Sequence, residues 1–196
     1  SVMHFKETIL QTRTSKIIAN IDFLYGKNDL ADFNNKVNIK AKFEKSKISI
    51  RDLKKYYNEL SGNDVISFSG SLNGMLNNFS LNKLNLRTNK GIRIIGDLAF
   101  VNAVNNENGF VFEGDLKNLT ATYGKLKNIL PNVLGKNLPS EFSKFGKFTI
   151  KGRVNVTPDQ MNATVNLKSE IGSIISDLQI SDIDNIDYAS YSGDIE

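Results

Sequence analysis

Two alternating apolar runs, joined by a polar loop, constrain the fold of this chain more than any other feature. In residues 91–101 and 110–117 apolar and polar side chains alternate, which is typical of β-strands because successive side chains leave a strand on opposite sides. The Asn- and Gly-rich loop 102–109 suits a hairpin, so we expect the two strands to pair antiparallel. The apolar face of this hairpin consists of Ile92, Ile94, Leu98, Phe100, Phe110, Phe112 and Leu116.

The same alternation recurs along most of the chain and predicts a mostly β protein with one long apolar sheet face. Further strands are expected at residues 5–12, 16–24, 37–43, 66–72, 79–86, 148–156, 161–167 and 174–180, and residues 48–50 extend the strand 37–43 or begin the next element. Between Leu81 and Leu84 the apolar residues change from odd-numbered to even-numbered positions, which predicts a β-bulge. The acidic tail that follows the last of these strands has no clear pattern.

Two short segments have helical instead of strand periodicity. Apolar residues at Leu53, Tyr56, Tyr57 and Leu60 follow the i, i+3, i+4, i+7 spacing, with Asp52 placed to cap the helix. A second pattern covers 125–130, ends before Pro131 and is followed by a loop-like stretch, 137–146. Helices this short do not persist alone in water, so we expect both to dock their apolar faces on the sheet.

The order of these elements occurs twice, which indicates an internal repeat. Each unit contains a strand, a short helix and three strands, with unit 1 at about 37–110 and unit 2 at about 110–182. The segment 68–72, for example, matches 150–154 in pattern. Partial units lie on both sides, and stacked repeats share their core with neighbours. We therefore expect the chain to be a segment of a longer protein.

Composition argues against several functional classes. The 196 residues carry a net charge of +4, and the basic residues look scattered along solvent-facing strand positions instead of forming the stripe expected for nucleic-acid binding. The chain has no cysteine and a single histidine, His4, which leaves no thiolate site, Ser-His-Asp triad or multi-histidine metal site. The acidic tail residues lack the spacing of a calcium-binding loop. We therefore expect no enzyme activity, metal or cofactor.

Several segments, taken in order, resemble the TamB proteins of Bacteroidetes-type bacteria, which belong to the broader AsmA-like group. These segments are Asp22–Gly26, Lys36–Ala41, Phe68–Leu72, Asn118–Tyr123 and Ser169–Leu178. The resemblance covers most of the chain from about residue 17 onward, and its specificity comes from the order of the segments.

The resemblance implies both a fold and a function. The fold is an elongated antiparallel β-sheet curved into a taco-like groove. The function is a periplasmic bridge that conducts phospholipid between the inner and outer membranes and supports outer-membrane assembly. The implied partners are phospholipid acyl chains and an Omp85-type outer-membrane barrel, which is contacted through another part of the chain. The parent protein would be anchored in the inner membrane.

The apolar residues that alternate along the strands share one face of the sheet, and they form the candidate site. We expect these residues to line a lipid groove: Phe68, Leu72, Ile92, Ile94, Leu98, Phe100, Phe110, Phe112, Leu116, Phe148, Ile150, Val154, Val165 and Leu167. The pattern alone equally fits the closed core of a β-sandwich. Two other functions remain open: a scaffold for outer-membrane protein assembly without lipid conduction, and a carbohydrate-processing or adhesive β-solenoid. The β-solenoid lacks the expected shorter repeat and carboxylate pair.

Overall fold

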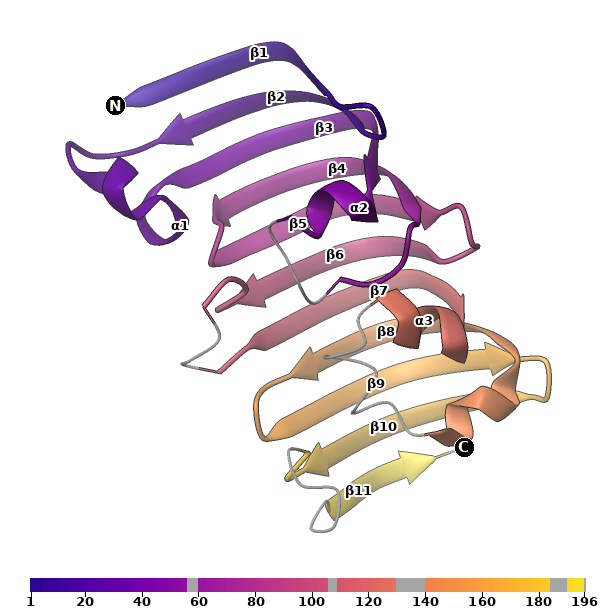
Figure 1. Ribbon diagram of the computed structural model, residues 1–196. Helices are drawn as coiled ribbons and strands as arrows, with labels where there is room; N and C mark the ends of the chain where they lie inside the picture. Colours follow the sequence, from indigo (N-terminus) through magenta and orange to yellow (C-terminus); the bar gives the residue numbers. More distant parts are fainter. Residues whose placement is uncertain (56–59, 106–108, 130–139, 184–189, 196) are drawn as a thin grey trace.

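The protein forms one long antiparallel β-sheet that is not closed, with 65% of its residues in strands and a few short helices. The computed structural model describes residues 1–55, 60–105, 109–129, 140–183 and 190–195 (Figure 1). This architecture confirms the predicted mostly β class and the elongated, curved antiparallel sheet.

Eleven strands lie in the sheet in the order of the sequence, so each strand pairs only with its neighbours along the chain. The strands are β1 (Val2–Gln11), β2 (Lys16–Leu24), β3 (Asn38–Ser49), β4 (Val65–Met75), β5 (Asn78–Thr88), β6 (Arg93–Val101), β7 (Val111–Thr122), β8 (Lys147–Val156), β9 (Gln160–Ser169), β10 (Ser173–Ser181) and β11 (Ser190–Ile195). The hairpin of β6 and β7, predicted from the alternating runs, lies in the middle of the sheet.

The helices are short and differ in position from the predicted ones. They are η1 (Asp29–Asp32), α1 (Phe33–Lys36), α2 (Ile50–Leu53), α3 (Tyr123–Ile129) and η2 (Ser140–Phe145). The helix expected at 53–60 is wrong, because α2 covers Ile50–Leu53 and residues 54–55 form a turn; residues 56–59 lie outside the described part of the chain. The helix expected at 125–130 begins two residues earlier, and η2 occupies part of a predicted loop.

Asp52 does not cap α2. The cap is Ser49, whose hydroxyl accepts the N–H of Arg51 at 3.3 Å. The Asp52 carboxylate instead accepts hydrogen bonds from the hydroxyls of Thr12, Thr14 and Ser15 in the turn between β1 and β2. These three bonds lower the pKa of Asp52 from 3.8 to about 2. The carboxylate thus ties α2 to a turn that lies far away in the sequence.

The acidic tail contains a strand that its sequence pattern does not reveal. Residues 190–195 form β11, which pairs along its whole length with β10. Backbone hydrogen bonds to an existing strand hold this segment, and they do not depend on apolar alternation. The elements β3-α2-β4-β5-β6 are followed by β7-α3-η2-β8-β9-β10, and the internal repeat stays a prediction.

A line of β-bulges crosses the sheet. Each pair from β1·β2 to β7·β8 contains a register shift, and the shift between Leu81 and Leu84 is the predicted bulge. The pairs from β8·β9 onward contain none. Two bulged residues with positive φ, Glu7 and Lys83, donate their backbone N–H to Asn20 and Asp97 on the next strand. Because a bulge bends and twists its strand, this line divides the strands from β1 to β8 into two arms.

Candidate functional site

The candidate site is the inner face of the sheet, which we define as the face that carries the fourteen predicted apolar residues. Strand register places directly paired side chains on the same face, and it joins these positions into rows that run across the strands. One row consists of Phe68, Leu86, Ile94, Leu119, Ile150, Leu167 and Ile174. A second row, on the other side of the bulge line, consists of Leu72, Leu81, Leu98, Gly114, Val154 and Ala163.

At the bend between these rows, large side chains alternate with glycine from strand to strand. Leu84, Gly96, Leu116, Gly152 and Val165 are directly paired in that order. A Cβ atom at Gly96 would lie 2.2 Å from the backbone oxygen of Asp115, and one at Gly152 would lie 2.1 Å from that of Thr164. Both glycines also have positive φ. Glycine is therefore required there so that neighbouring strands can approach where the sheet bends.

One side of the inner face is sealed by helices. Ile92, Ala121, Phe148 and Leu167 are between 1% and 5% exposed and form one cluster. Leu126 of α3 and Phe145 of η2 pack against this cluster. The ribbon shows α2 and α3 lying over the sheet on this side (Figure 1). We call this region the helix side.

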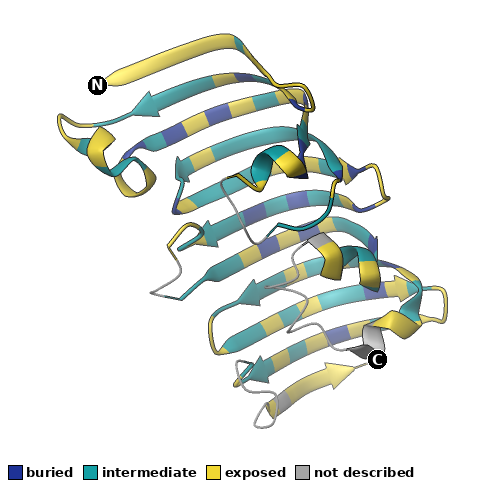
Figure 2. Ribbon diagram, viewed as in Figure 1, coloured by how far each residue is buried: buried dark blue, intermediate teal, exposed yellow. Residues whose placement is uncertain are grey.

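The opposite side of the inner face carries aromatic side chains that are only half-buried. Phe100 lies at its centre, with ring centroids 4.9 Å from Phe79, 5.4 Å from Phe112 and 6.3 Å from Phe110. No described helix packs on these four rings, and Figure 2 shows intermediate exposure along much of this part of the sheet. We call this region the open side.

All fourteen predicted residues lie on the inner face, and none of them is fully exposed. Five are buried: Ile92, Leu98, Leu116, Phe148 and Leu167. The remaining nine are half-buried. The structure therefore brings the predicted set together on one surface, in which a buried part continues into a partly accessible one.

Several inner-face residues were absent from the predicted set. Phe79 and Leu84 belong to β5, and Leu119 follows the bulge of β7. A bulge shifts the parity of every later residue in its strand, so a strict period of two assigns such residues to the wrong face. For β5 the sequence did contain a signal of this shift, namely the change from odd to even apolar positions between Leu81 and Leu84.

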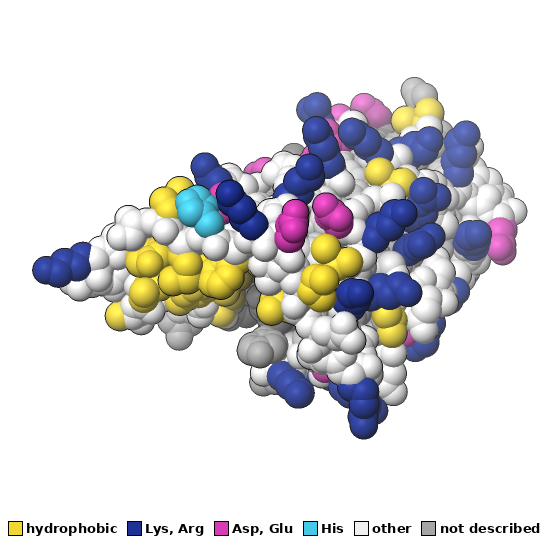
Figure 3. Space-filling view, turned by 90° about the horizontal axis from the view of Figure 1, so that it is seen from above, with side chains coloured by type: hydrophobic (Ala, Val, Ile, Leu, Met, Phe, Trp, Pro, Cys, Tyr) yellow, Lys and Arg dark blue, Asp and Glu magenta, His cyan; other side chains and the backbone are white. Residues whose placement is uncertain are grey.

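Apolar side chains also gather at the β1 edge. Phe5, Phe23 and Phe33 form a chain of edge-to-face ring contacts at 5.5 Å. On β1 itself, Ile9 and Leu10 are more than half exposed. Figure 3, which looks onto this edge, shows one hydrophobic patch, while Lys and Arg side chains spread over other parts of the surface.

The charged groups form few contacts. Within the described ranges, the ion pairs are His4 with Asp22 at 2.7 Å and Lys90 with Asp64 at 2.7 Å. No group of His, Asp or Glu side chains in the described part of the chain is placed to hold a metal ion. Of the predicted acidic tail cluster, Asp184 and Asp187 lie outside the described residues. None of the described helices has the length and apolar character needed to span a bilayer.

Comparison of the chain with protein-family models, with curated proteins and with solved structures finds no match.

Proposed function

We propose that the open side of the inner face binds lipid acyl chains, and that the chain is a segment of a TamB-type bridge that conducts phospholipid between two membranes. The observation that carries this proposal is the continuous apolar face on an open sheet, where nine of the fourteen predicted residues are half-buried. A large apolar surface in contact with water is unfavourable, so such a face requires an occupant.

The dimensions of the face suit an acyl chain. The predicted residues extend from β4 to β9, which is five strand spacings of about 4.8 Å, or roughly 24 Å. One leaflet of a bilayer has a hydrocarbon depth of about 15 Å. An acyl chain lying across the strands would therefore remain on apolar side chains along its whole length.

The half-buried side chains have the right chemistry for this ligand. Aromatic and aliphatic groups line the open side, while the polar residues of the same strands, such as Glu113 and Arg93, are exposed on the opposite face. Burying an acyl chain removes apolar area from water at about 25 cal/mol per Å². The remaining parts of the proposal, periplasmic location, an inner-membrane anchor and an Omp85-type barrel as partner, come from the family resemblance. The proposal includes no catalytic step and no cofactor.

A second function is a scaffold for outer-membrane protein assembly without lipid conduction. The sealed helix side favours this alternative, because it shows that the side chains fill part of the inner face by themselves.

Photocrosslinking distinguishes the two functions. A photoreactive residue at Phe112, on the open side, is expected to crosslink phospholipid in cells, whereas the same residue at Glu113 on the outer face is the matched control. Mass spectrometry of the purified protein should then identify bound native lipid. If neither position captures lipid and no lipid copurifies, lipid conduction is wrong and the scaffold remains.

Charge substitutions test the same point. Phe112→Arg places a cation where acyl chains would lie, which costs roughly 2–4 kcal/mol at lipid-facing positions of membrane barrels. We expect loss of lipid crosslinking from a protein that still folds, because Phe112 is half-buried. The outer-face variants Arg93→Glu and Glu113→Arg should crosslink normally. If Phe112→Arg unfolds the protein, the open side is a core and not a groove.

A further inference from the structure

The outer face of the sheet carries a row of cations that the register of the strands brings together. Nine residues are directly paired in succession from β2 to β10: Lys16, Lys47, Ser67, Arg87, Arg93, Thr120, Thr149, Lys168 and Ser173. We call this set the cationic row. It contains five cations and four hydroxyl groups, and no carboxylate.

The cations of this row are not neutralised by the protein. Lys16 lies directly opposite Lys47, and Arg87 lies directly opposite Arg93. Like charges placed opposite each other on adjacent strands are destabilising. All five cationic side chains are exposed, and neither ion pair found in the described ranges includes one of them. The row therefore carries a concentrated positive charge that an anionic ligand would balance.

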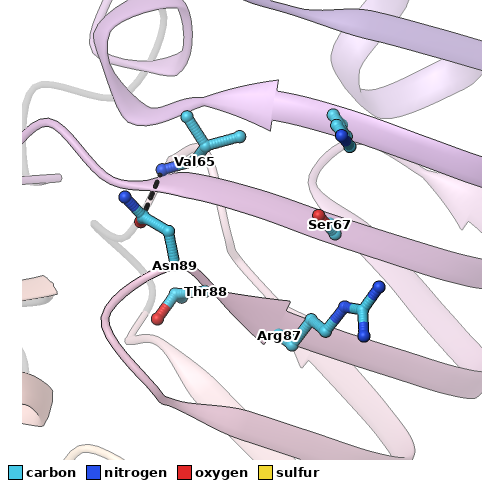
Figure 4. A pocket seen from close by; sticks show the side chains of 6 residues that line it. Val65, Ser67, Arg87, Thr88 and Asn89 are labelled. Carbon is cyan, nitrogen blue, oxygen red and sulfur yellow. Dashed lines mark hydrogen bonds between the residues drawn. The ribbon is translucent and has the colours of Figure 1, made fainter.

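Two shallow depressions lie on the cationic row. One, of about 200 Å³, is lined by Lys47, Val65, Ser67, Arg87, Thr88 and Asn89 (Figure 4). The second, of about 170 Å³, is lined by Thr149, Lys151, Asn166 and Lys168. Each combines two cations with hydroxyl or amide groups. They are four strand spacings apart, or about 19 Å, which suits one extended ligand that reaches both.

On the other arm of the outer face the charges are mixed. There Asp97 lies opposite Asp115, and Asp177 lies opposite Asp194, but Asp115 also lies opposite Arg153, and Lys40 and Lys42 are exposed on β3. Five basic residues thus gather in the cationic row, while other Lys and Arg side chains spread over the surface.

The groups around the cations favour one class of polyanion. Single-stranded nucleic acids need aromatic side chains on which bases stack, and the row has none. Ser67, Thr120, Thr149 and Asn166 both donate and accept hydrogen bonds, which suits a ligand rich in hydroxyl groups. The row extends over eight strand spacings, roughly 38 Å.

We propose that the cationic row binds an acidic polysaccharide, which lies across the strands with its carboxylate groups on Lys and Arg and its hydroxyl groups on Ser, Thr and Asn. This site is on the opposite face from the apolar one, so it does not depend on the proposed lipid function. Binding should weaken as salt is added, because exposed charges supply much of the attraction.

The test is a titration of the full chain with fluorescently labelled oligogalacturonate at low salt, with uncharged dextran as the negative probe. The double variant Lys47→Gln with Arg87→Gln removes both cations of the larger depression. We expect binding to weaken roughly 10-fold or more, since charge-assisted hydrogen bonds are lost. The matched control is Lys40→Gln with Lys42→Gln, two exposed cations on the other arm of β3, which should change binding less than 2-fold.

Three outcomes would overturn the proposal. Equal weakening by both double variants would show general charge attraction instead of a site. Equal affinity for inorganic polyphosphate would mean that the hydroxyl and amide groups contribute nothing to recognition. Binding to vesicles that contain phosphatidylglycerol, without binding to oligogalacturonate, would assign the row to a membrane surface. Because all four substituted residues are exposed, the variants should fold normally, and thermal melting checks this.

Discussion

The helix side and the open side of the inner face are made from the same strands with the same apolar alternation, yet they differ in burial. Phe148 on the helix side is 1% exposed, whereas Phe112 on the open side is half-buried. Leu126 and Phe145, which come from two short helices, cover the first side, and no described helix packs on the aromatic rings of the second.

The comparison shows that an alternating pattern identifies the apolar face of a strand but not its environment. A sealed core and a surface able to take a ligand can lie on one face, separated by a few residues along each strand. Cover by a helix is one cause of burial, and packing of the strands' own side chains, which buries Leu84, Leu98 and Leu116, is another. The following predictions test this difference, beginning with the largest expected effect.

Truncation of an aromatic ring should cost much more stability on the helix side. Phe148→Ala is expected to lower the free energy of unfolding by about 3–5 kcal/mol, because the ring is fully buried and leaves a cavity. Phe100→Ala, at a half-buried position on the open side, should cost about 1–2 kcal/mol. Urea unfolding of both variants measures the difference. Equal losses would mean that the open side is packed as tightly as the helix side.

The bend that separates the two sides should depend on its glycines. In Gly152→Ala the new Cβ would meet the backbone oxygen of Thr164, and we expect a loss of about 1–3 kcal/mol from overpacking. Gly114→Ala is the control, because the nearest atoms to its Cβ, at 3.1 Å, belong to the side chain of Phe112. That substitution should be tolerated better. A smaller loss at Gly152 than at Gly114 would contradict the role of close strand approach.

Weakening the contact of α3 with the sheet should make the buried residues of the helix side more accessible to solvent, as on the open side. Leu126→Ala takes from α3 its contact with the buried cluster, and we expect a loss of about 1–2 kcal/mol since the side chain is half-buried. Lys127→Ala, at an exposed position on the same helix, is the control. Hydrogen exchange at the backbone of Phe148 should accelerate in Leu126→Ala. An unchanged exchange rate would show that α3 does not seal this side.

The attachment of α2 should weaken in acid. The pKa of Asp52 is lowered from 3.8 to about 2 by three hydroxyl donors, so its contribution to stability is complete above pH 3.8 and is lost as the pH falls through about 2. The wild type should therefore lose more thermal stability between pH 5 and pH 2 than Asp52→Asn. Parallel pH profiles of melting temperature would contradict this role.

Most of the strands were predictable because their apolar side chains recur at every second residue. Even the bulge of β5 left a visible trace, the parity slip between Leu81 and Leu84. The start of α2 was not predictable from the spacing of Leu53 and Leu60, because Asp52 finds its hydrogen-bond partners in a remote turn. The strand β11 was not predicted for a similar reason, because backbone hydrogen bonds to β10 hold it in the sheet.

The surface charges show the limit of sequence patterns more clearly. Arg87 and Arg93 are close in the chain, and their pairing follows from a hairpin. Lys16, Lys47 and Lys168 join the same row only through the register of every strand between them. A shift of one residue in any pair would move these side chains to the other face. The cationic row is therefore a property of the assembled sheet.

The strict order of the strands has a consequence for how this molecule folds and how its length is set. Since each strand pairs only with its neighbours in sequence, no interface waits for a distant strand, although the connection between β7 and β8 is long enough to contain α3 and η2. The energetics are then nearly one-dimensional, a sum of similar nearest-neighbour terms. Adding or removing a hairpin changes the span of the molecule by about 10 Å and leaves every other interface as it was.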